Sequence, residues 1–432
     1  MAVGIAGIGT ATPAGVFAAE PAALADVLQD ENFQNSEFWV YNNIPAAFAE
    51  ARRTGKPLLV TFRCVPCQAC KGFDAEVAAG AGQVKALADE RFVAVRQVEM
   101  KGVDLSQFQF DYDLNWAAMF LNADGTVYAR YGTQGAEGPD AYNSIEGLVN
   151  TMQRVLELHA EYPANRAELA GKRGPDTPYH TALDMPGLEN KERFVGATAR
   201  NNCIHCHNIH DAENRHAKTT GRMNDDLLWR FPLPENIGLV IDANHGRRIA
   251  KVLPDSPAAN SGLTEREEVT HVGGQAITSI ADIQWVLDHL PNERVTVDVR
   301  GSETGEHTLA LARGWKETDI SWRGSIWSVS PILRTWMPEL TAQQRRERGL
   351  PADRPAFEVR WINRNEAGGK AIYEAGIREG DVVVAFNGEP IEQEKSQQFM
   401  THIKLHYNVG DRVTFTVLRD GQRKQIEIPL VE

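Results

Sequence analysis

Apolar and polar residues follow strand and helix periods along the first third of the chain. A fully apolar run at 58–62 predicts a buried strand, and residues 43–54 before it have the composition of a helix. The stretch 92–100 predicts a further strand, and Asp124-Gly125 predicts the turn of a hairpin. An apolar stripe at helical spacing predicts a closing helix: Ile145, Leu148, Val149, Met152, Val155 and Leu156.

The second half of the chain carries one pattern twice. Residues 236–313 and 345–432 each contain a short helix ended by glycine, a hairpin with glycine in its turn, a longer helix and closing strands. Recurrence of a whole pattern predicts two domains of the same architecture. The stretch 314–344 between them is predicted to be a connector, with aromatic side chains that pack at an interface. Its tryptophans are Trp315, Trp322, Trp327 and Trp336.

Composition places this pattern in a multidomain globular protein of α/β and α+β class. The chain has 432 residues, 42% hydrophobic and 24% charged, which is enough for two to four domains with cores of their own. A formal net charge of −13 argues against nucleic-acid partners. No run of 18 apolar residues occurs, so no transmembrane segment is predicted.

The N-terminus has the character of an export signal. Residues 2–18 are mostly small and apolar, they end near an Ala-Xaa-Ala-like site, and the first basic residue is Arg52. We interpret 1–19 as the remnant of a signal peptide and expect a protein of the periplasm or cell envelope. The alternative is a disordered Ala/Gly leader.

Five cysteines lie in two clusters, which indicates metal, haem or redox chemistry rather than a disulfide framework. Cys203-Ile204-His205-Cys206-His207 has the Cys-Xaa-Xaa-Cys-His pattern of c-type haem attachment. Cys203 and Cys206 would form thioethers to the haem, and His207 would be the proximal iron ligand. A structural zinc site or a redox dithiol are the alternatives for this motif.

The segment that carries this motif, 161–235, is polar and rich in loops. Only the 28 residues 208–235 follow His207 before the next domain begins. That length is too short for an ordinary cytochrome core, so we expect the other domains to supply much of any haem pocket.

Residues 36–160 resemble the thioredoxin-like family, because the strand at 58–62 leads directly into RCVPCQACKGFDAEV. The resemblance places the redox dithiol at Cys67 and Cys70 and leaves Cys64 as an additional thiol at the strand end. The cis-proline that faces the dithiol in this family is missing from 114–118. A cis bond without proline is costly, so this loop is predicted to be trans and differently shaped.

Residues 236–313 and 345–432 resemble bacterial PDZ domains. The resemblance implies carboxylate-binding loops at Ile237-Gly238-Leu239 and at Gly349-Leu350-Pro351. Such loops bind the C-terminus of a partner, which adds a strand to the domain. The alternative is that both domains serve only as packing modules.

The whole order of domains resembles a family of bacterial thioredoxin/PDZ-domain proteins, in which some members are selenoproteins with selenocysteine in the thioredoxin cluster. The motifs that carry this resemblance are FRCVPCQAC, FQFDYDLNWA, NNCIHCHNIH and FPLPENIGL. The resemblance implies one covalent haem c whose iron takes a thiolate or selenolate from the thioredoxin domain. This chain has cysteine at all three cluster positions. Spacing favours Cys64 as the distal ligand, with Cys67 as the alternative.

Three functions remain open at this point. The first is electron transfer, or redox or ligand sensing, by a haem c protein that has a redox partner. The second is an enzyme, either a thiol-disulfide oxidoreductase or a haem peroxidase. The third is a scaffold that binds copper or zinc and recruits partner C-termini through its PDZ domains.

Overall fold

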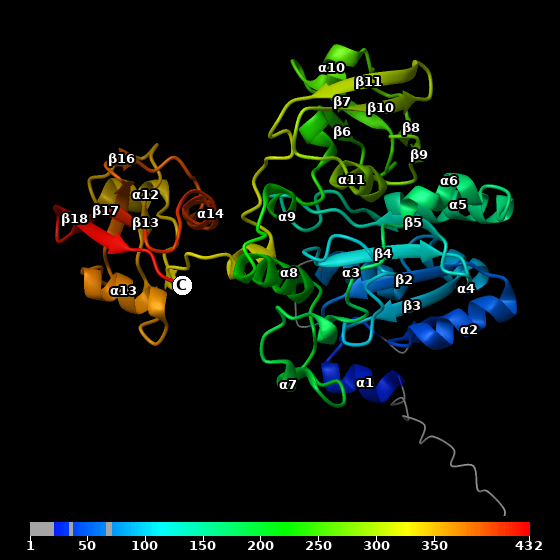
Figure 1. Cartoon of the computed structure of the whole chain (residues 1–432), viewed down its shortest axis with the longest axis horizontal. Coiled ribbons are helices and arrows are strands. Elements are labelled where there is room, and N and C mark those ends of the chain that lie inside the picture. Colours follow the sequence, from blue (N-terminus) through cyan, green and yellow to red (C-terminus); the bar gives the residue numbers. More distant parts are fainter. Residues whose placement is uncertain (1–20, 34–37, 66–70) are drawn as a thin grey trace, which may run out of the picture.

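The computed structural model describes residues 21–33, 38–65 and 71–432. Two parts are visible in Figure 1: a large body that contains the thioredoxin-like domain and the first PDZ domain, and a smaller lobe formed by the second PDZ domain. The predicted signal remnant at 1–19 and the predicted dithiol, Cys67 and Cys70, lie outside the described residues.

The thioredoxin-like domain is built on a five-stranded sheet of order β1-β3-β2-β4-β5. Strands β1, β3 and β2 are parallel, and β4 and β5 are antiparallel neighbours beyond them. The strands are β1 (Trp39–Tyr41), β2 (Leu58–Arg63), β3 (Val93–Gln97), β4 (Trp116–Leu121) and β5 (Val127–Tyr131). The helices are α1 (Pro21–Leu28), α2 (Ile44–Thr54), α3 (Lys71–Ala79), α4 (Val84–Arg91) and α5 (Ile145–Glu161).

The local sequence accounts for these elements. The side chain of Asn43 accepts the Ala46 N–H at 3.1 Å and so begins α2, and Gly55 ends it in the left-handed conformation. Every residue of β2 is buried, because other parts of the protein cover both faces of the sheet. The predicted strands, the hairpin and the closing helix are confirmed.

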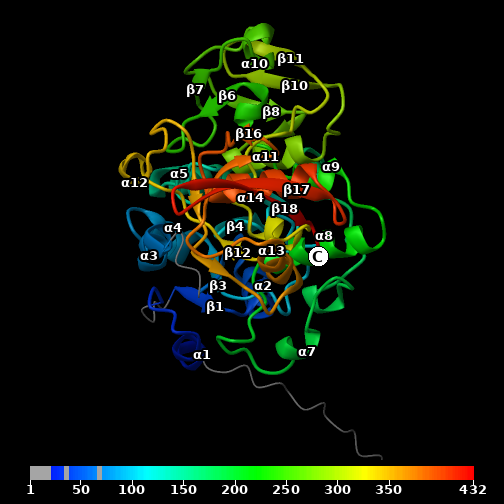
Figure 2. The ribbon, with the colours of Figure 1, turned by 90° about the vertical axis from the view of Figure 1, so that its left-hand side faces the viewer.

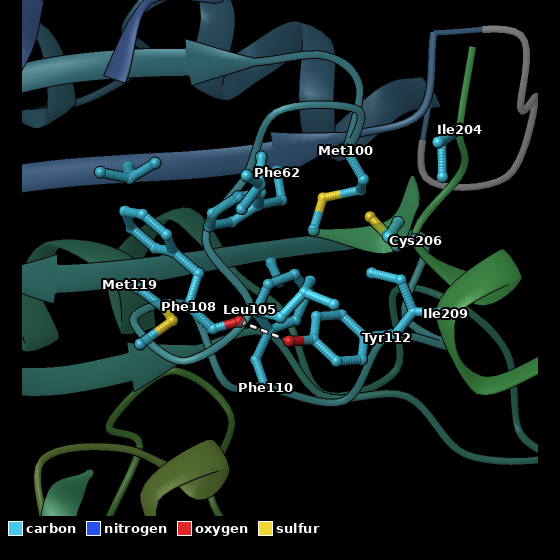
Figure 3. Close-up of a cluster of buried hydrophobic side chains, with 14 of the residues drawn as sticks. Phe62, Met100, Leu105, Phe108, Phe110, Tyr112, Met119, Ile204, Cys206 and Ile209 are labelled. Atoms are coloured by element: carbon cyan, nitrogen blue, oxygen red, sulfur yellow. Dashed lines mark hydrogen bonds between the residues drawn. The ribbon is translucent and has the colours of Figure 1, made fainter. Parts of the chain in front are cut away.

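The middle segment forms short helices and has its hydrophobic side chains in the core of the thioredoxin-like domain. Figure 3 shows Ile204, Cys206 and Ile209 of this segment against Met100 and Tyr112 of the domain. A segment too short for its own core is stabilised by such packing. Its elements are α6 (Arg166–Leu169), η1 (Ala170–Lys172), η2 (Ala182–Asp184), α7 (Lys191–Phe194), α8 (His207–Thr219) and α9 (Asp225–Leu228).

The first PDZ domain packs on the thioredoxin-like domain through the helix α11 at the edge of the sheet and through the loop after β6, where Asn150 and Arg154 of α5 donate to the carbonyls of Asn244 and His245. The carboxylate of Asp282 on this helix accepts the Arg130 N–H at 3.1 Å and lies 2.7 Å from the Lys172 Nζ. The elements are η3 (Pro234–Ile237), β6 (Leu239–Ile241), β7 (Ile249–Val252), α10 (Pro257–Ser261), β8 (Val269–Val272), β9 (Gln275–Ala276), α11 (Ile280–Asp288), β10 (Val295–Gly301) and β11 (Gly305–Leu311).

The second PDZ domain lies in front of the body in Figure 2 and touches it through a small contact. Leu405 packs on Ile320, Ile326 and Val329 of the connector. The elements from the connector onward are η4 (Gly324–Ser328), β12 (Thr335–Trp336), α12 (Ala342–Glu347), β13 (Phe357–Glu358), β14 (Trp361–Ile362), α13 (Ala367–Ala375), β15 (Val382–Phe386), β16 (Glu389–Pro390), α14 (Ser396–His406), β17 (Arg412–Arg419) and β18 (Gln422–Pro429).

The start of the second PDZ domain differs from the sequence boundary at 345. Strand β12 pairs with β14, and Leu333 and Met337 lie in this domain's hydrophobic core. Part of the predicted connector therefore belongs to the domain. Within the described part of the chain, no helix combines the length and apolar character needed to cross a membrane.

Candidate functional site

Cys64 follows the last residue of β2, above a buried ion-pair network. Arg63 lies 3.0 Å from Asp74 on α3, and Arg96 on β3 contacts Asp74 at 2.8 Å and Asp30 at 2.9 Å. Burial acts to raise the pKa of Asp74, but the hydrogen bonds and charges of Arg96 and Arg63 hold it below its ordinary value. These charge-assisted bonds fix the strand end that presents Cys64.

The Cys203–His207 motif lies directly beside Cys64. The Cys64 Sγ is 2.5 Å from the Nδ1 of His205, one of the two residues between the motif cysteines, 141 positions along the chain. Burial lowers the pKa of His205 to about 4, and the charges of His207 and Arg193 act in the same direction. His205 is therefore a neutral imidazole at pH 7 that can accept a hydrogen bond from the thiol, while its low pKa makes it a weak base.

The two motif cysteines are buried at the junction of the middle segment and the thioredoxin-like domain. Cys203 is 5% exposed and Cys206 is 9% exposed. The sulfur atoms of Cys206 and Met100 lie near each other in Figure 3, and the Met100 N–H donates to the Ile204 carbonyl at 3.0 Å. Burial raises the pKa of Cys203 to about 11, so its thiol is protonated at neutral pH.

His207 is the first residue of α8 and is held between two neighbours. Its ring stacks on that of His205, with centroids 5.5 Å apart and planes at 14°. Gly324 of η4 also lies close to the ring, since a Cβ there would come within 3.2 Å of the His207 Cγ. A larger side chain at 324 would crowd His207, so this glycine lets the connector approach the ring.

A buried charged cluster, which we call the Asp113 cluster (Asp111, Asp113, His210, Arg323 and Ser325), joins three parts of the body. Asp113 accepts the Ser325 N–H at 2.8 Å, the Ser325 hydroxyl at 2.7 Å and His210 Nδ1 at 3.2 Å. The Arg323 Nη1 lies 2.8 Å from Asp111 and 3.2 Å from Asp113. The thioredoxin-like domain, α8 and the connector are thereby fixed to one another next to His207.

The Asp113 cluster contains the one group of three potential metal ligands found among the described residues, Asp111, Asp113 and His210. Arg323 already places a buried cation between these carboxylates. We therefore read the group as a charge-compensated structural cluster. The sequence prediction missed it, although FQFDYDLNWA and NNCIHCHNIH carry three of its residues.

The loop that replaces the proline loop of the thioredoxin-like family is all trans over 114–118, as the missing proline predicts. Trp116 on β4 is buried, and Asn115 donates to Gln134 at 2.8 Å. Asp111 and Asp113 of the Asp113 cluster lie directly before this loop in the chain. The loop is therefore fixed by the rest of the body.

An apolar cavity of about 250 Å³ lies along α8, one turn beyond the motif. Its walls include Tyr112, Tyr179, Met185, Ile209 and Ala212.

The potential haem ligands lie together at the motif: two buried cysteines, a histidine at a helix start and a nearby cysteine from another domain. This set of donors matches the chemistry of a covalently attached haem.

The predicted carboxylate-binding loop of the first PDZ domain is buried. Ile237 and Leu239 have no exposed surface, and the Gly238 N–H already donates to the Glu235 carbonyl at 3.0 Å. A Cβ at Gly238 would lie 2.0 Å from the Ser256 Oγ. Tyr142 of the thioredoxin-like domain packs against the core that contains this loop.

The predicted loop of the second PDZ domain, Gly349 and Leu350, lies between α12 and β13. Leu350 lines a hollow on that side of the domain together with Pro390 and Arg423. The strand in the position of β6 is instead β12, since each pairs with the strand that leads into the helix ended by glycine, α10 in the first domain and α13 in the second. Residues 333–335 therefore take the place of 237–239.

The groove between β12 and α14, which we call the Trp336 groove, was not found from the sequence. It is an open hollow of about 480 Å³ whose walls include Arg334, Trp336, Trp361, Met400 and Lys404. Trp336 is 55% exposed and Trp361 51% exposed. A patch of exposed tryptophan is a common sign of a binding surface. The high density of tryptophan near residue 336 was the feature of the sequence that could have indicated this groove.

The comparisons with known families agree with this architecture. Residues 39–123 match the family model described as thioredoxin-like, and residues 248–301 and 368–430 match models of the PDZ domain. The chain contains a thioredoxin-like domain and two PDZ domains.

Curated relatives cover part of the chain. A protein of Pseudomonas savastanoi pv. phaseolicola, named probable periplasmic serine endoprotease DegP-like, is 29% identical over 206 residues, which are 46% of this chain and 40% of that protein. A protein of the same name from Marinomonas sp. is 26% identical over 44% of this chain and 38% of its own length. The chain spans about 40% of the length of these relatives.

Among solved structures, the HtrA-type protease AlgW with decapeptide is similar at 12% identity, with a TM-score of 0.20. The match covers 38% of this chain and 54% of that one. A substituted form of the same protease with tripeptide has 18% identity and a TM-score of 0.19, over 30% of this chain and 40% of that one.

Proposed function

We propose that this chain is an exported haem c-binding protein in which two domains share one haem. Cys203 and Cys206 hold the haem through thioethers, His207 is the proximal iron ligand and Cys64 supplies the distal thiolate. A bound haem of this kind supplies a one-electron redox centre, suited to electron transfer or to redox or ligand sensing.

The contact between Cys64 and His205 carries this proposal. It brings a cysteine of the thioredoxin-like domain to within 2.5 Å of the motif. Cys67, the alternative ligand, lies outside the described residues, so the proximity argument applies to Cys64. The neutral imidazole of His205 can accept a hydrogen bond from the Cys64 thiol, and a bound metal would favour the thiolate, the form that ligates metals.

The surrounding residues would position the ligands and keep water out. The stacking of His205 and the close approach of Gly324 limit the rotation of the His207 ring. The buried side chains around Cys206, among them Met100 and Ile209, exclude solvent from this side of the motif. A dry setting around a metal centre influences its redox potential.

Two observations support the wider assignment. The curated relatives are named as periplasmic, and residues 1–19 have the character of an export signal. Partner binding is assigned to the Trp336 groove, because in the first PDZ domain α11 packs on the thioredoxin-like domain and the loop is buried in the core of its own domain, on which Tyr142 packs. That groove would take the apolar C-terminal residues of a partner polypeptide.

The test is to mature the full chain with a haem-attachment system and record its spectrum with and without reductant. We expect a haem band that survives denaturing electrophoresis, and a shifted Soret maximum in Cys64→Ser. Cys67→Ser is the matched control, with an unchanged spectrum expected. Cys203→Ser should lose one thioether and weaken the covalent band.

The outcomes separate the candidate functions. An unchanged spectrum in Cys64→Ser together with a shift in Cys67→Ser moves the distal ligand to Cys67. Absence of any covalent haem rejects the proposal. Reduction of insulin by such haem-free protein with a thiol donor would favour the thiol-disulfide oxidoreductase, for which His205 beside Cys64 is the favourable observation.

A further inference from the structure

The apolar cavity of about 250 Å³ lies on the side of α8 that faces away from His207. At ~100° per residue, the wall residues Ile209, Ala212 and His216 lie about 140–180° around the helix from His207. The position of the proximal ligand and the cavity therefore belong to opposite faces of α8. A group held by His207 would leave the cavity free for a separate ligand.

The inner walls of the cavity are apolar and buried. Met185 and Ile209 are each 1% exposed, and Ala212 has no exposed surface. Figure 3 shows the Tyr112 ring beside Ile209, and the Tyr112 hydroxyl already donates to the Phe108 carbonyl at 2.7 Å, so Tyr112 offers the cavity its ring alone. An apolar cavity of about 150 Å³ is large enough to bind benzene. This larger cavity has room for an aromatic ring that carries a short side chain.

Three polar side chains line the same cavity: the Tyr179 hydroxyl, the His216 imidazole and the Arg222 guanidinium. No hydrogen bond or ion pair joins these three side chains to another residue in the described part of the chain. Arg222, Thr220 and Pro178 are exposed wall residues, so they mark the mouth of the cavity. Each of the three polar groups can donate a hydrogen bond. Donors that converge on one cavity without an acceptor fit a ligand that brings a carboxylate.

Glu213, the one acidic residue in the described wall, has its charge compensated from inside the body. Arg230 forms an ion pair with its carboxylate, and the His210 Nε2 lies 3.9 Å from the same oxygen. Burial acts to raise the pKa of Glu213, but the charges of Arg230 and His210 and the hydrogen bond from Arg230 hold it below its ordinary value. Among the described wall residues, Arg222 is therefore the charged group that has no counter-ion.

We propose that this cavity binds a small aromatic monocarboxylate, whose ring lies against Tyr112 and Met185 and whose carboxylate meets Arg222 at the mouth. Aromatic rings pack well on other rings and on thioether sulfur, and a guanidinium binds a carboxylate through paired hydrogen bonds. The site uses none of the proposed haem ligands, so its test is independent of the proposed function. The Tyr112 ring also contacts His210 of the Asp113 cluster, with centroids 5.2 Å apart, so a bound acid would lie one side chain from that cluster.

The experiment is a calorimetric titration of the full chain with phenylacetate at pH 7. We expect one molecule to bind per chain, and phenylacetamide, which has the same shape without the charge, to bind more weakly. Arg222→Gln should weaken binding of phenylacetate roughly fivefold, a modest factor because the guanidinium is exposed to water, and should leave binding of phenylacetamide unchanged. Lys218→Gln is the matched control, because Lys218 is a cation of the same helix that pairs with Glu432 and does not line the cavity.

Two further measurements locate the bound acid. Ala217→Leu places a larger side chain in the wall of the cavity and should abolish the binding that the titration detects. In spectra of ¹³C-methyl-labelled methionine, phenylacetate should shift the signal of Met185 and leave that of Met337, in the core of the second PDZ domain, unchanged. The methionine spectra use the wild type, so they decide the location even where a variant does not fold.

Four outcomes would overturn the proposal. Absence of binding at millimolar phenylacetate, or binding without a shift of the Met185 signal, would show that the cavity does not take this ligand. Equal affinity for phenylacetate and phenylacetamide, or equal weakening in Arg222→Gln and Lys218→Gln, would show that Arg222 does not recognise a carboxylate there.

Discussion

The two PDZ domains share one architecture and differ in what surrounds their longer helices. In the first domain, α11 lies against the thioredoxin-like domain, and its Asp282 and the Lys172 it contacts have no exposed side-chain surface. In the second domain, α14 lines the open Trp336 groove and meets the body through Leu405 and a few polar contacts. One domain has become part of the body, and the other keeps an open groove.

The largest expected effect on stability concerns the polar contacts that attach each PDZ domain to the rest of the molecule. Asp282→Asn leaves the Lys172 ammonium buried without its counter-charge, which should cost about 3–5 kcal/mol of stability. Gln398→Ala removes a partly exposed hydrogen bond to Asp319 and should cost only about 1 kcal/mol. Urea unfolding followed by circular dichroism measures both.

Hydrogen exchange locates the effect of each substitution. Asp282→Asn should speed exchange in β5 and α11 together, while Gln398→Ala should leave both unchanged. Similar costs for the two substitutions would contradict the contrast between a buried and a loosely attached domain.

Acid should weaken the body through the Asp113 cluster. Burial acts to raise the pKa of Asp113, but the hydrogen bond and charge of His210 and the charge of Arg323 hold it well below the ordinary value. A lowered pKa in the folded state means that this stabilisation is complete above about pH 3.9 and is lost as the pH falls through the folded value.

Acid unfolding followed by circular dichroism tests this linkage. Asp113→Asn should be less stable than the wild type at pH 7 and should lose less stability between pH 5 and pH 2. A variant whose stability falls as steeply with acid as that of the wild type would show that other carboxylates dominate. Asp319 of the connector, which bonds to Gln398 of the second domain, is the comparison, and its half-buried position predicts a smaller acid effect of Asp319→Asn.

The smallest expected effect concerns peptide binding. Trp336→Ala in the Trp336 groove should weaken binding of a labelled decapeptide with an apolar C-terminus by about 1–2 kcal/mol, roughly 5–30-fold in Kd. Val240→Ala on β6 of the first domain is the control and should change nothing. Fluorescence anisotropy of the labelled peptide gives both constants. Weakening by Val240→Ala alone would assign binding to the first domain instead.

Patterns of local origin were predicted well. The run at 58–62 became β2, the stripe from Ile145 became α5, and the Asp124-Gly125 turn joins β4 to β5. These features depend on the period of apolar side chains and on turn residues, which are written in neighbouring positions. The two PDZ patterns were recognised for the same reason.

Contacts between segments that are distant in the sequence were harder to predict. Gly349 and Leu350 lie away from the Trp336 groove because β12 is the strand that pairs with β14. Each of these strands has only two residues, which is too short to show an alternating pattern in the sequence. The Asp113 cluster joins residues of three segments, and isolated aspartate and arginine residues in a sequence do not reveal their partners. The spare thiol at Cys64 was identified from spacing, but its neighbour His205 was not.

The sequence by itself determined the kinds of domain and their order, and it predicts the chemistry of the cysteines, because strand and helix periods and the Cys203–His207 motif are local properties of the chain. Only the tertiary structure decided that Cys64 meets His205, that the first PDZ domain is closed and that the second is open. Those outcomes depend on how domains bury apolar surface and charge against each other, and that energy depends on the shape of the assembled molecule.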